Sequence, residues 1–397
     1  MKLEHLPQEF ELARPVLQTI EQAGYEAYFV GGSVRDTILG KPIHDVDIAT
    51  SAYPNEIKGL FKRTVDTGIE HGTVMILDHG TGYETTTFRS ESTYTDFRRP
   101  DHVTFVRSLA EDLKRRDFTI NALAMRENGE VIDLFEGLSD LQSHRIRAVG
   151  DAQERFHEDA LRMMRAVRFA SQLDFTIVPE TLAAITAHAQ LLDKIAVERT
   201  QVELLKLLTG KTPQRGLTDM LATGLWRYCP DFAAHEHALQ TLAQRLTHGV
   251  SSEIAAWTLL VTAFGLEPTK VTPFMKHWKT ANQTATAVQT ASKTAGQLLQ
   301  GDLNAWQLYQ CGHDLIAIAN EVAVILGAND RQPALAQRLA ALPIQHKKEL
   351  AVTGKDLMQA GIQPGPQLGA ILGDLEYQVV TGAVANDRAA LVARATA

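Results

Sequence analysis

The sequence predicts an α+β head followed by an all-α remainder, and two observations lead to this class. Up to about residue 145, short apolar runs of strand type alternate with turns. Beyond about residue 150, the chain is rich in Ala, Leu, Gln and Thr at helical spacing, with Gly and Pro as punctuation. A chain of 397 residues is too long for one core, so several domains are expected.

Within the head, five apolar runs are expected to be strands. They are residues 27–30, 45–49, 73–77, 83–88 and 103–106. The first is followed by Gly31 and Gly32, which let the backbone turn sharply, and a helix can begin at Val34. Backbone N–H groups at such a helix start suit a triphosphate. Taken alone, a Gly-Gly pair is usually a simple turn.

The second run carries Asp45 and Asp47, one residue apart. On a strand both carboxylates project from the same face, while Val46 and Ile48 point into the core. Such a pair can hold Mg²⁺ between protein and phosphates, and two metals roughly 3.5–4 Å apart can assist an in-line displacement. Taken alone, such a pair is usually a solvated strand end. In this order and spacing, the glycine and aspartate motifs together favour a nucleotide-polymerising site.

Two further charged groups are candidates for that site. Arg116 closes a run of three cations that precedes Asp117 and an apolar, helix-like run, and its guanidinium can fork onto phosphate oxygens. The alternative is a solvated basic turn. Glu84, on the run 83–88, is either a third carboxylate of the metal site or an exposed strand acid.

Residues 158–168 have helical spacing, which places Asp159, Arg162 and Arg165 on one strip with Arg168 on its flank. A carboxylate beside a guanidinium can read the Watson–Crick edge of a base. A carboxylate accepts from the exocyclic amino group of cytosine or adenine, so this interpretation predicts selection for C and A. The alternative is a helix decorated with ordinary ion pairs.

Composition restricts the class of protein. A net charge of −8 excludes a uniformly basic nucleic-acid binder, so any RNA contact must rest on local patches. The two cysteines, Cys229 and Cys311, indicate a reducing compartment and are expected to be buried, inert thiols. The N-terminus lacks a hydrophobic signal region, and apolar stretches such as 255–266 are too short to span a bilayer. We therefore expect a cytoplasmic protein.

The remaining segments that we singled out are not expected to take part directly in catalysis. His313 and Asp314 lack further metal ligands at suitable spacing and are expected on a helix surface. The polar, basic segment 89–100 is expected to be a mobile loop near the site. Near the end of the chain, a helix is expected over 367–380, and a later one capped by Asn386.

Six motifs occur in a fixed order between residues 31 and 208. They are GGSVRD (31–36), DVDIAT (45–50), RRDFTINA (115–122), DLFEG (133–137), EDALRMMRAVRF (158–169) and ERTQVELLKLL (198–208). In this order the chain resembles the class II tRNA nucleotidyltransferases, the CCA-adding enzymes, and most closely their Gram-positive bacterial type. The resemblance implies a polymerase-β-like nucleotidyltransferase fold for the head, at residues 1–142. A neck at 143–209, a body at 210–275 and a tail at 276–397 would be helical and give a seahorse shape.

The resemblance also implies roles in the head. Gly32 and Arg35 would contact the nucleotide phosphates, and Asp45 and Asp47 would bind Mg²⁺. Arg116 would contact the incoming nucleotide. The segment 89–100 resembles a flexible loop that helps the switch from C to A.

For the neck, the resemblance implies a protein template for the base. Asp159 and Arg162 would read the base, Arg165 and Arg168 would assist at the nucleotide, and the helical element 198–208 would steady the template. The body and tail would hold the acceptor end and elbow of tRNA through its phosphates. The family's bacterial members also suggest a homodimer.

The resemblance implies template-independent addition of C, C and A to tRNA from CTP and ATP, with release of pyrophosphate. Poly(A) synthesis and partial CC- or A-addition share the head motifs, although the basic loop argues against a CC-only enzyme and the neck and tail argue against poly(A) synthesis. A non-catalytic RNA-binding relative is disfavoured because both Asp45 and Asp47 are present. Nucleotidyl transfer to a small molecule or a protein would fit the glycine and aspartate motifs but would not explain the basic loop and the long helical half.

Overall fold

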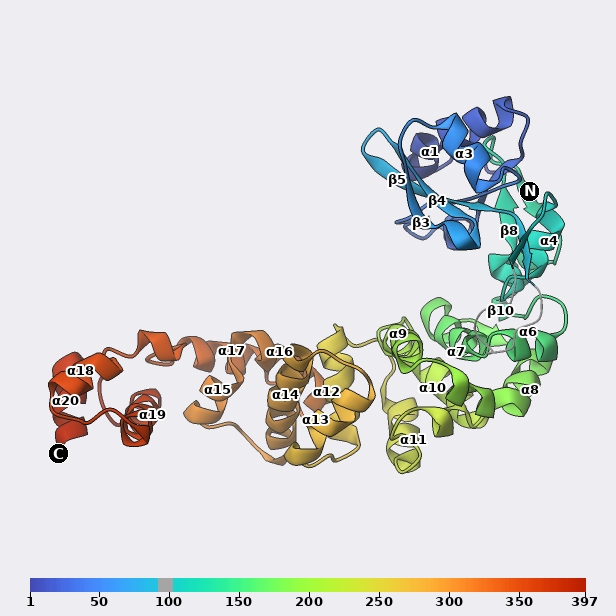
Figure 1. Ribbon diagram of the computed structural model, residues 1–397. Coiled ribbons are helices and arrows are strands. Elements are labelled where there is room, and N and C mark those ends of the chain that lie inside the picture. The colour runs from blue at the N-terminus through green and yellow to red at the C-terminus, as the bar shows by residue number, and fades with distance from the viewer. Residues whose placement is uncertain (92–102) are drawn as a thin grey trace. The chain divides into compact units, whose positions relative to one another are not determined.

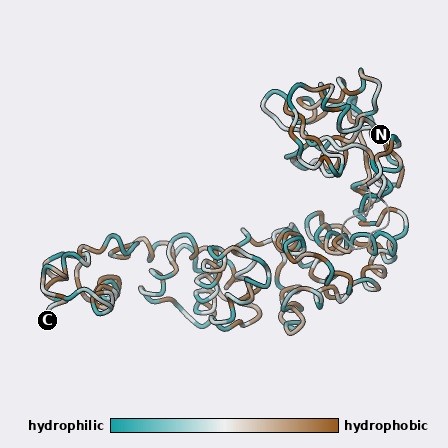
Figure 2. The backbone as a smooth tube through the Cα atoms, viewed as in Figure 1, coloured by the Kyte–Doolittle hydropathy of each residue, from teal (hydrophilic) through white to brown (hydrophobic). Residues whose placement is uncertain are grey.

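The computed structural model describes residues 1–91 and 103–397, and Figure 1 shows their helices and strands along the chain. The chain divides into two compact units, Met1–Glu236 and His237–Ala397. Apolar and polar stretches are mixed along both units (Figure 2). In the described part of the chain, no helix is both long and apolar enough to cross a membrane.

The first unit holds all the strands of the described chain, together with helices. Its elements are α1 (Gln8–Gln22), β1 (Ala27–Val30), α2 (Gly32–Ile38), β2 (Asp47–Thr50), α3 (Pro54–Leu60), β3 (Thr64–Gly68), η1 (Ile69–His71), β4 (Thr73–Asp78), β5 (Thr81–Thr87), β6 (Arg89–Glu91), β7 (Val103–Phe105), α4 (Leu109–Lys114), η2 (Thr119–Asn121), β8 (Leu123–Met125), β9 (Val131–Asp133), α5 (Gly137–Gln142), β10 (Arg145–Ile146), α6 (Ala152–Glu158), α7 (Leu161–Leu173), β11 (Thr176–Ile177), α8 (Pro179–His188), η3 (Ala189–Lys194), α9 (Val197–Leu208), α10 (Pro213–Ala222) and η4 (Leu225–Tyr228).

A seven-stranded sheet organises the head, in the order β3-β4-β5-β2-β1-β8-β9. β2 and β5 run parallel, with Ile48 opposite Thr85, and the other neighbours are antiparallel. Strand β1 is buried along its whole length, as its unbroken apolar run predicts. The ring of Phe29 packs against Phe10 of α1 at 4.6 Å between centroids. This core fixes β1, which pairs with β2 and leads into the glycine turn.

The turn after β9 is stabilised by a single carboxylate. Asp133 accepts hydrogen bonds from the backbone N–H groups of Gly137 and Leu138, both at 2.9 Å, at the start of α5. A Cβ atom on Gly137 would lie 2.3 Å from the carbonyl oxygen of Thr119, so only glycine fits this approach. The DLFEG motif is therefore a compact strand-to-helix turn packed on η2.

The helices after the head surround α7, whose side chains are mostly buried. α9 and α10 pack against α7. The contact with α10 is close, since a Cβ atom on Gly216 would lie 2.5 Å from the carbonyl oxygen of Val167. α7 is thereby held as a rigid support for the charged residues that it carries.

The second unit is entirely helical in its regular structure. Its elements are α11 (Glu236–Arg245), which begins at the last residue of the first unit, α12 (Glu253–Ala263), α13 (Pro268–His277), α14 (Asn282–Gln300), α15 (Ala305–Cys311), α16 (His313–Leu326), α17 (Gln332–Ala340), η5 (Lys347–Glu349), α18 (Gly354–Gln359), α19 (Pro366–Val380) and α20 (Arg388–Thr396). The apolar stretch around 255–266 forms α12, a core helix packed against α14 and α16. A second core lies among α18, α19 and α20 and includes Leu357, Leu375 and Leu391.

The predicted fold class is confirmed, and several local expectations are wrong. The run after Arg116 is not a regular helix but the short turn η2 followed by strand β8. The segment 158–168 is not one helix, because α6 ends at Glu158 and α7 begins at Leu161. Asp387, not Asn386, caps α20 by accepting from the N–H of Ala390 at 3.0 Å.

Candidate nucleotide-binding site

The glycine turn after β1 approaches two charged side chains. Gly31 has φ +74° and precedes α2. A Cβ atom at this position would lie 3.4 Å from Nη1 of Arg116 and 3.7 Å from Oδ2 of Asp47. The absent side chain thus leaves the turn, a carboxylate and a guanidinium around one point, as a phosphate-binding site requires.

Asp45 and Asp47 follow the predicted alternation. Both are exposed, whereas Val46 and Ile48 are buried. Strand β2 begins at Asp47, which pairs with Val30 of β1, so Asp45 lies just before the strand rather than on it. The two carboxylates still face away from the core.

Glu84 lies on β5, the parallel neighbour of β2, and lines a pocket of about 200 Å³ together with Asp47. The other charged residues of this pocket are Arg89, Asp112, Arg115 and Arg116. The residue Asp47 is exposed overall, but the surrounding pocket partly desolvates its carboxylate and so raises its pKa. The charges of Glu84 and Asp45 raise this pKa further, and Arg116 lowers it. Repulsion among these carboxylates would be relieved by a cation.

The carboxylates of the pocket suit a metal ion that is coordinated partly by protein and partly by a bound phosphate, rather than one coordinated by protein alone. Among residues 1–91 and 103–397, no three His, Cys, Asp or Glu side chains are grouped closely enough to hold a metal by themselves. Two carboxylates completed by phosphate oxygens and water suit Mg²⁺, which retains several non-protein ligands. Nε of Arg116 is also buried without an acceptor in the described structure. A phosphate oxygen would supply one.

Asp112, at 1% exposure, orders the basic side of the pocket. It accepts from Nη2 of Arg115 at 2.8 Å and from Nη2 of Arg116 at 3.2 Å. Burial alone would raise the pKa of Asp112, but the two guanidinium groups lower it. One carboxylate shared by two arginines leaves an excess positive charge, which suits an anionic ligand. Asp112 lies in a short helical segment of the sequence, and no motif there indicates that it contacts two arginines of the site.

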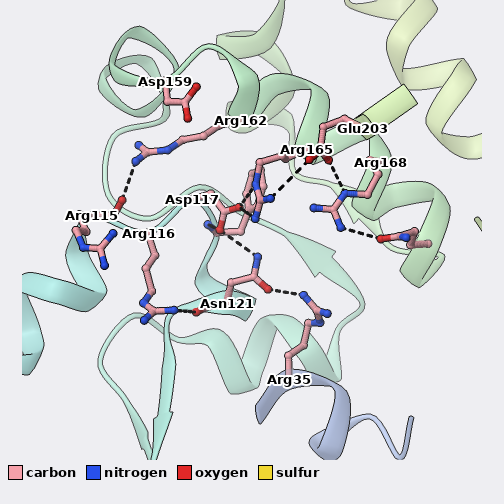
Figure 3. Close-up of polar contacts among 12 residues, drawn as sticks. Arg35, Arg115, Arg116, Asp117, Asn121, Asp159, Arg162, Arg165, Arg168 and Glu203 are labelled. Atoms are coloured by element: carbon pink, nitrogen blue, oxygen red, sulfur yellow. Dashed lines mark hydrogen bonds and ion pairs between the residues drawn. The ribbon is translucent and has the colours of Figure 1, made fainter. Parts of the chain in front are cut away.

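Asp159 and Arg162 lie at the junction of α6 and α7 but are held by different partners. Asp159 accepts from the N–H of Leu161 at 3.0 Å and from Nη2 of Arg199 on α9 at 3.1 Å. Arg162 donates to Oε2 of Glu158 and to the carbonyl oxygen of Arg115, both at 2.8 Å. Its bond to Arg115 brings the neck against the basic segment of the head (Figure 3).

A second polar network, drawn in Figure 3, starts in the head. Nη1 of Arg35 donates to Oδ1 of Asn121 at 2.6 Å. Nδ2 of Asn121 donates to Asp117 at 3.0 Å, and Asp117 accepts from Nε of Arg165 at 2.7 Å. The network therefore joins α2 of the head to α7 of the neck.

The network continues from α7 to α9 through Glu203. This buried carboxylate lies 3.8 Å from Nη1 of Arg165 and accepts from Nε of Arg168 at 2.8 Å. Nη1 of Arg168 also donates to Gln172 at 2.8 Å. The contacts of Glu203 and Arg199 are those of a helix that steadies α7, in line with the expectation for residues 198–208.

The predicted site residues thus fall into three groups. Asp47, Glu84 and Arg116 line the pocket, Gly32 begins α2 after the glycine turn, and Asp45 lies just before β2 outside the pocket lining. Arg35, Arg165 and Arg168 belong to the network. Asp159 and Arg162 lie at the junction of α6 and α7 and do not line the pocket. The network residues missed from the sequence include Asp117, Asn121, Arg199 and Glu203; Asp117 directly follows the cation run, which was the available signal.

Two other expectations concern exposed segments. His313 and Asp314 are exposed at the start of α16, as predicted for a helix surface. Of the expected loop 89–100, residues 92–100 lie outside the described residues. Its first residues form β6, where Arg89 pairs with Phe105 of β7.

Three family models match the chain. The one described as "Poly A polymerase head domain" matches residues 27–147, and "Probable RNA and SrmB- binding site of polymerase A" matches 174–236. The one described as "tRNA nucleotidyltransferase domain 2 putative" matches 249–395.

Similar proteins extend over the full length. A CCA-adding enzyme of Levilactobacillus brevis is 77% identical over 396 residues, covering 100% of both chains. A CCA-adding enzyme of Lactiplantibacillus plantarum is 58% identical, covering 99% of this chain and 97% of its own. Among solved structures, the Bacillus stearothermophilus CCA-adding enzyme in complex with CTP has a TM-score of 0.90 at 40% identity, covering 98% of each chain. The Thermotoga maritima CCA-adding enzyme complexed with tRNA has a TM-score of 0.68 at 20% identity, covering 99% and 96%, and supports the fold alone.

Proposed function

The chain belongs to the class II CCA-adding enzymes, and from this premise we propose which residues add C, C and A to the 3′ end of tRNA from CTP and ATP. The convergence of Gly31, Asp47 and Arg116 on one point carries the proposal. In the reaction, the 3′-hydroxyl of the tRNA attacks the α-phosphate, and pyrophosphate leaves.

Nucleotidyltransferases of this family generally need a divalent metal, and we propose Mg²⁺ held by Asp45 and Asp47. When bound, it supplies Lewis-acid stabilisation of the developing charge on the phosphate oxygens. Glu84, on the neighbouring strand and in the same pocket, acts as a third catalytic carboxylate. Its contribution to the raised pKa of Asp47 supports a shared electrostatic site.

The triphosphate is bound by the glycine turn and the basic side of the pocket. Gly32 begins α2 next to Arg35, whose Nη2 would lie in van der Waals contact, at 3.6 Å, with a Cβ atom at position 32. Arg116 reaches the phosphates from the opposite side with its remaining donors. Arg35 is buried against Asp36 and Asn121, so only its remaining N–H groups are available to a phosphate.

Asp159 and Arg162 select the base, and Arg165 and Arg168 assist at the nucleotide. A carboxylate at Asp159 accepts from the amino group that cytosine and adenine share, which guanine and uracil do not present in the same place. The bond between Arg162 and the carbonyl oxygen of Arg115 supports this role, since it joins Arg162 to the segment that carries Arg116. Protein side chains thereby replace a nucleic-acid template.

We extend the proposal to partners and organisation. The helical body and tail contact the acceptor end and elbow of tRNA, with a head at 1–142, neck at 143–209, body at 210–275 and tail at 276–397. The enzyme acts in the cytoplasm, in tRNA maturation and repair, and can form a homodimer. Support comes from the family itself and, for the second unit, from the match at 249–395.

Extension of a tRNA that lacks its 3′ CCA tests the reaction. Purified protein with Mg²⁺, CTP and ATP should lengthen this tRNA by three nucleotides, and CTP alone should give two. Sequencing the product separates this outcome from its alternatives. A ladder of A residues would identify a poly(A) polymerase, and extension without C would overturn the proposal.

A further inference from the structure

Phe169 on α7 lies at the centre of the polar network, although it is apolar and only 3% exposed. Three guanidinium carbons lie over its ring, those of Arg168 at 3.5 Å, Arg35 at 5.0 Å and Arg165 at 5.4 Å from the centroid. Each distance is within the range at which a cation is attracted to an aromatic face. One ring thus contacts cations from the head and from the neck.

Each of these arginines also has its own carboxylate. Arg35 pairs with Asp36 at 2.8 Å, Arg165 with Asp117 at 2.7 Å and Arg168 with Glu203 at 2.8 Å. The three ion pairs balance in charge, which allows three guanidinium groups to gather in a small, largely buried volume. Burial and the nearby Arg165 lower the pKa of Arg168 to about 10, which leaves this group cationic at neutral pH.

The carboxylates and the ring contact different parts of each guanidinium group. The hydrogen bonds hold each guanidinium by its edges, since Arg35 donates to Asp36 and Asn121 and Arg165 donates twice to Asp117. The ring adds a contact on the flat face of the guanidinium, which edge hydrogen bonds do not cover. A leucine at position 169 would fill much of the volume but has no quadrupole, so it would remove this face contact and leave only the edge hydrogen bonds.

We propose that Phe169 is a positioning residue for nucleotide binding, which holds Arg35 of the glycine-turn helix and Arg165 of the template helix in one arrangement through its ring. This inference rests on the proposed function, which places these arginines at the nucleotide. Asp159 and Arg162 are held by Arg199, Glu158 and Arg115 rather than by the ring. Phe169 therefore affects how tightly CTP and ATP bind and leaves the choice between bases unchanged.

Ring-fluorinated phenylalanines at position 169 test the inference directly, because stepwise fluorination weakens the quadrupole while nearly preserving ring shape. KM for CTP and for ATP should rise progressively with fluorine number, with kcat and base selection little changed. Phe169→Leu should raise both KM values roughly tenfold, the change expected from losing one to two cation–π contacts.

Phe156→Leu is the matched control, since Phe156 on α6 is also fully buried in the same unit. It should lower the melting temperature about as much as Phe169→Leu and leave both KM values near wild type. The inference is overturned if the fluorinated series behaves as wild type, since ring packing alone would then explain any loss in Phe169→Leu. It is also overturned if KM rises for one nucleotide only. Failure of the wild-type enzyme to add CCA would instead reject the proposed function, so the two failures are distinguishable.

Discussion

Arg165 and Asp117, 48 residues apart, form a two-donor ion pair, with Nε and Nη2 of the arginine each 2.7 Å from Oδ2 of the acid. Burial alone would raise the pKa of Asp117, but Arg165 and a hydrogen bond from Asn121 lower it. The carboxylate therefore stays ionised, and the pair joins the basic segment of the head to the neck helix throughout the neutral pH range.

A double-mutant cycle on this pair should show strong coupling. Arg165→Ala and Asp117→Ala should each destabilise the protein, because each leaves a charge without its partner. The double variant should lose less than the sum, with a coupling energy of about 1 to 3 kcal/mol. Chemical denaturation of the four proteins measures this, and additive losses would contradict it.

Asp47→Asn should lower kcat at least about 100-fold, since a metal ligand contributes several kcal/mol to the transition state. Melting temperature should change little, because Asp47 is exposed and outside the core. Glu84→Gln should lower kcat less, as expected for a carboxylate that supports the other two. Single-turnover extension of tRNA measures both variants. Wild-type turnover in Asp47→Asn would remove this residue from the mechanism.

Gly31→Ala should weaken nucleotide binding, because its Cβ atom would intrude 3.4 Å from Nη1 of Arg116. Gly40→Ala is a matched control, since Gly40 also has positive φ (+65°) and no heavy atom within 4 Å of the added Cβ. Both variants should lose about 1 to 2 kcal/mol of stability through backbone strain. Calorimetric binding of CTP should separate them, and equal affinities would count against the glycine turn as part of the site.

Asp159→Asn should relax base selection, because an amide can donate to the carbonyl group of uracil or guanine where a carboxylate only accepts. We expect UTP or GTP to be incorporated at a measurable rate and CTP less efficiently. Asp174→Asn, at the other end of α7, serves as a control. Extension with each nucleotide separately gives the result, and unchanged discrimination would exclude Asp159 as the selecting acid.

Asp219 predicts a pH effect on stability. Burial raises its pKa to about 6, with Arg215 opposing, from about 3.9 in an unfolded chain. The folded state therefore holds the proton more tightly, and stability falls as pH rises from about 4 to about 6. Asp219→Asn should remove this cost above pH 6, by about 3 kcal/mol, with little effect below pH 4. Unfolding curves at pH 4 and pH 7.5 check this, and Asp193→Asn, at an exposed site, should show no such difference.

Several strands of the head were predictable because their signal is local. The run 27–30 is strand β1, and the glycines and the Asp45–Asp47 alternation lie where their motifs indicate. Strand β3 was missed because Thr64, Asp66 and Gly68 give it little apolar character, and Val65 is exposed at the sheet edge.

The arrangement of the charged residues in the neck could not be predicted from the sequence, because it depends on tertiary contacts. Helical spacing over 158–168 predicts one strip, but Asp159 has extended backbone (φ −131°, ψ 102°), and its carboxylate bonds to the N–H of Leu161 instead of continuing a helix. From the sequence alone, Phe169 is predicted to be an ordinary residue of the hydrophobic core. Its contact with Arg35 spans more than a hundred residues, and only the folded packing of α2 against the neck reveals it.

The two cysteines have a practical consequence. Cys229 lies in the first unit and Cys311 in the second, both buried and free, and burial raises the pKa of each thiol. A thiol-specific reagent can therefore modify either sulfur only when the surrounding helices open transiently. Since each unit contains one such sulfur, the labelling rate at each position reports local unfolding of that half of the enzyme separately, without any engineered probe.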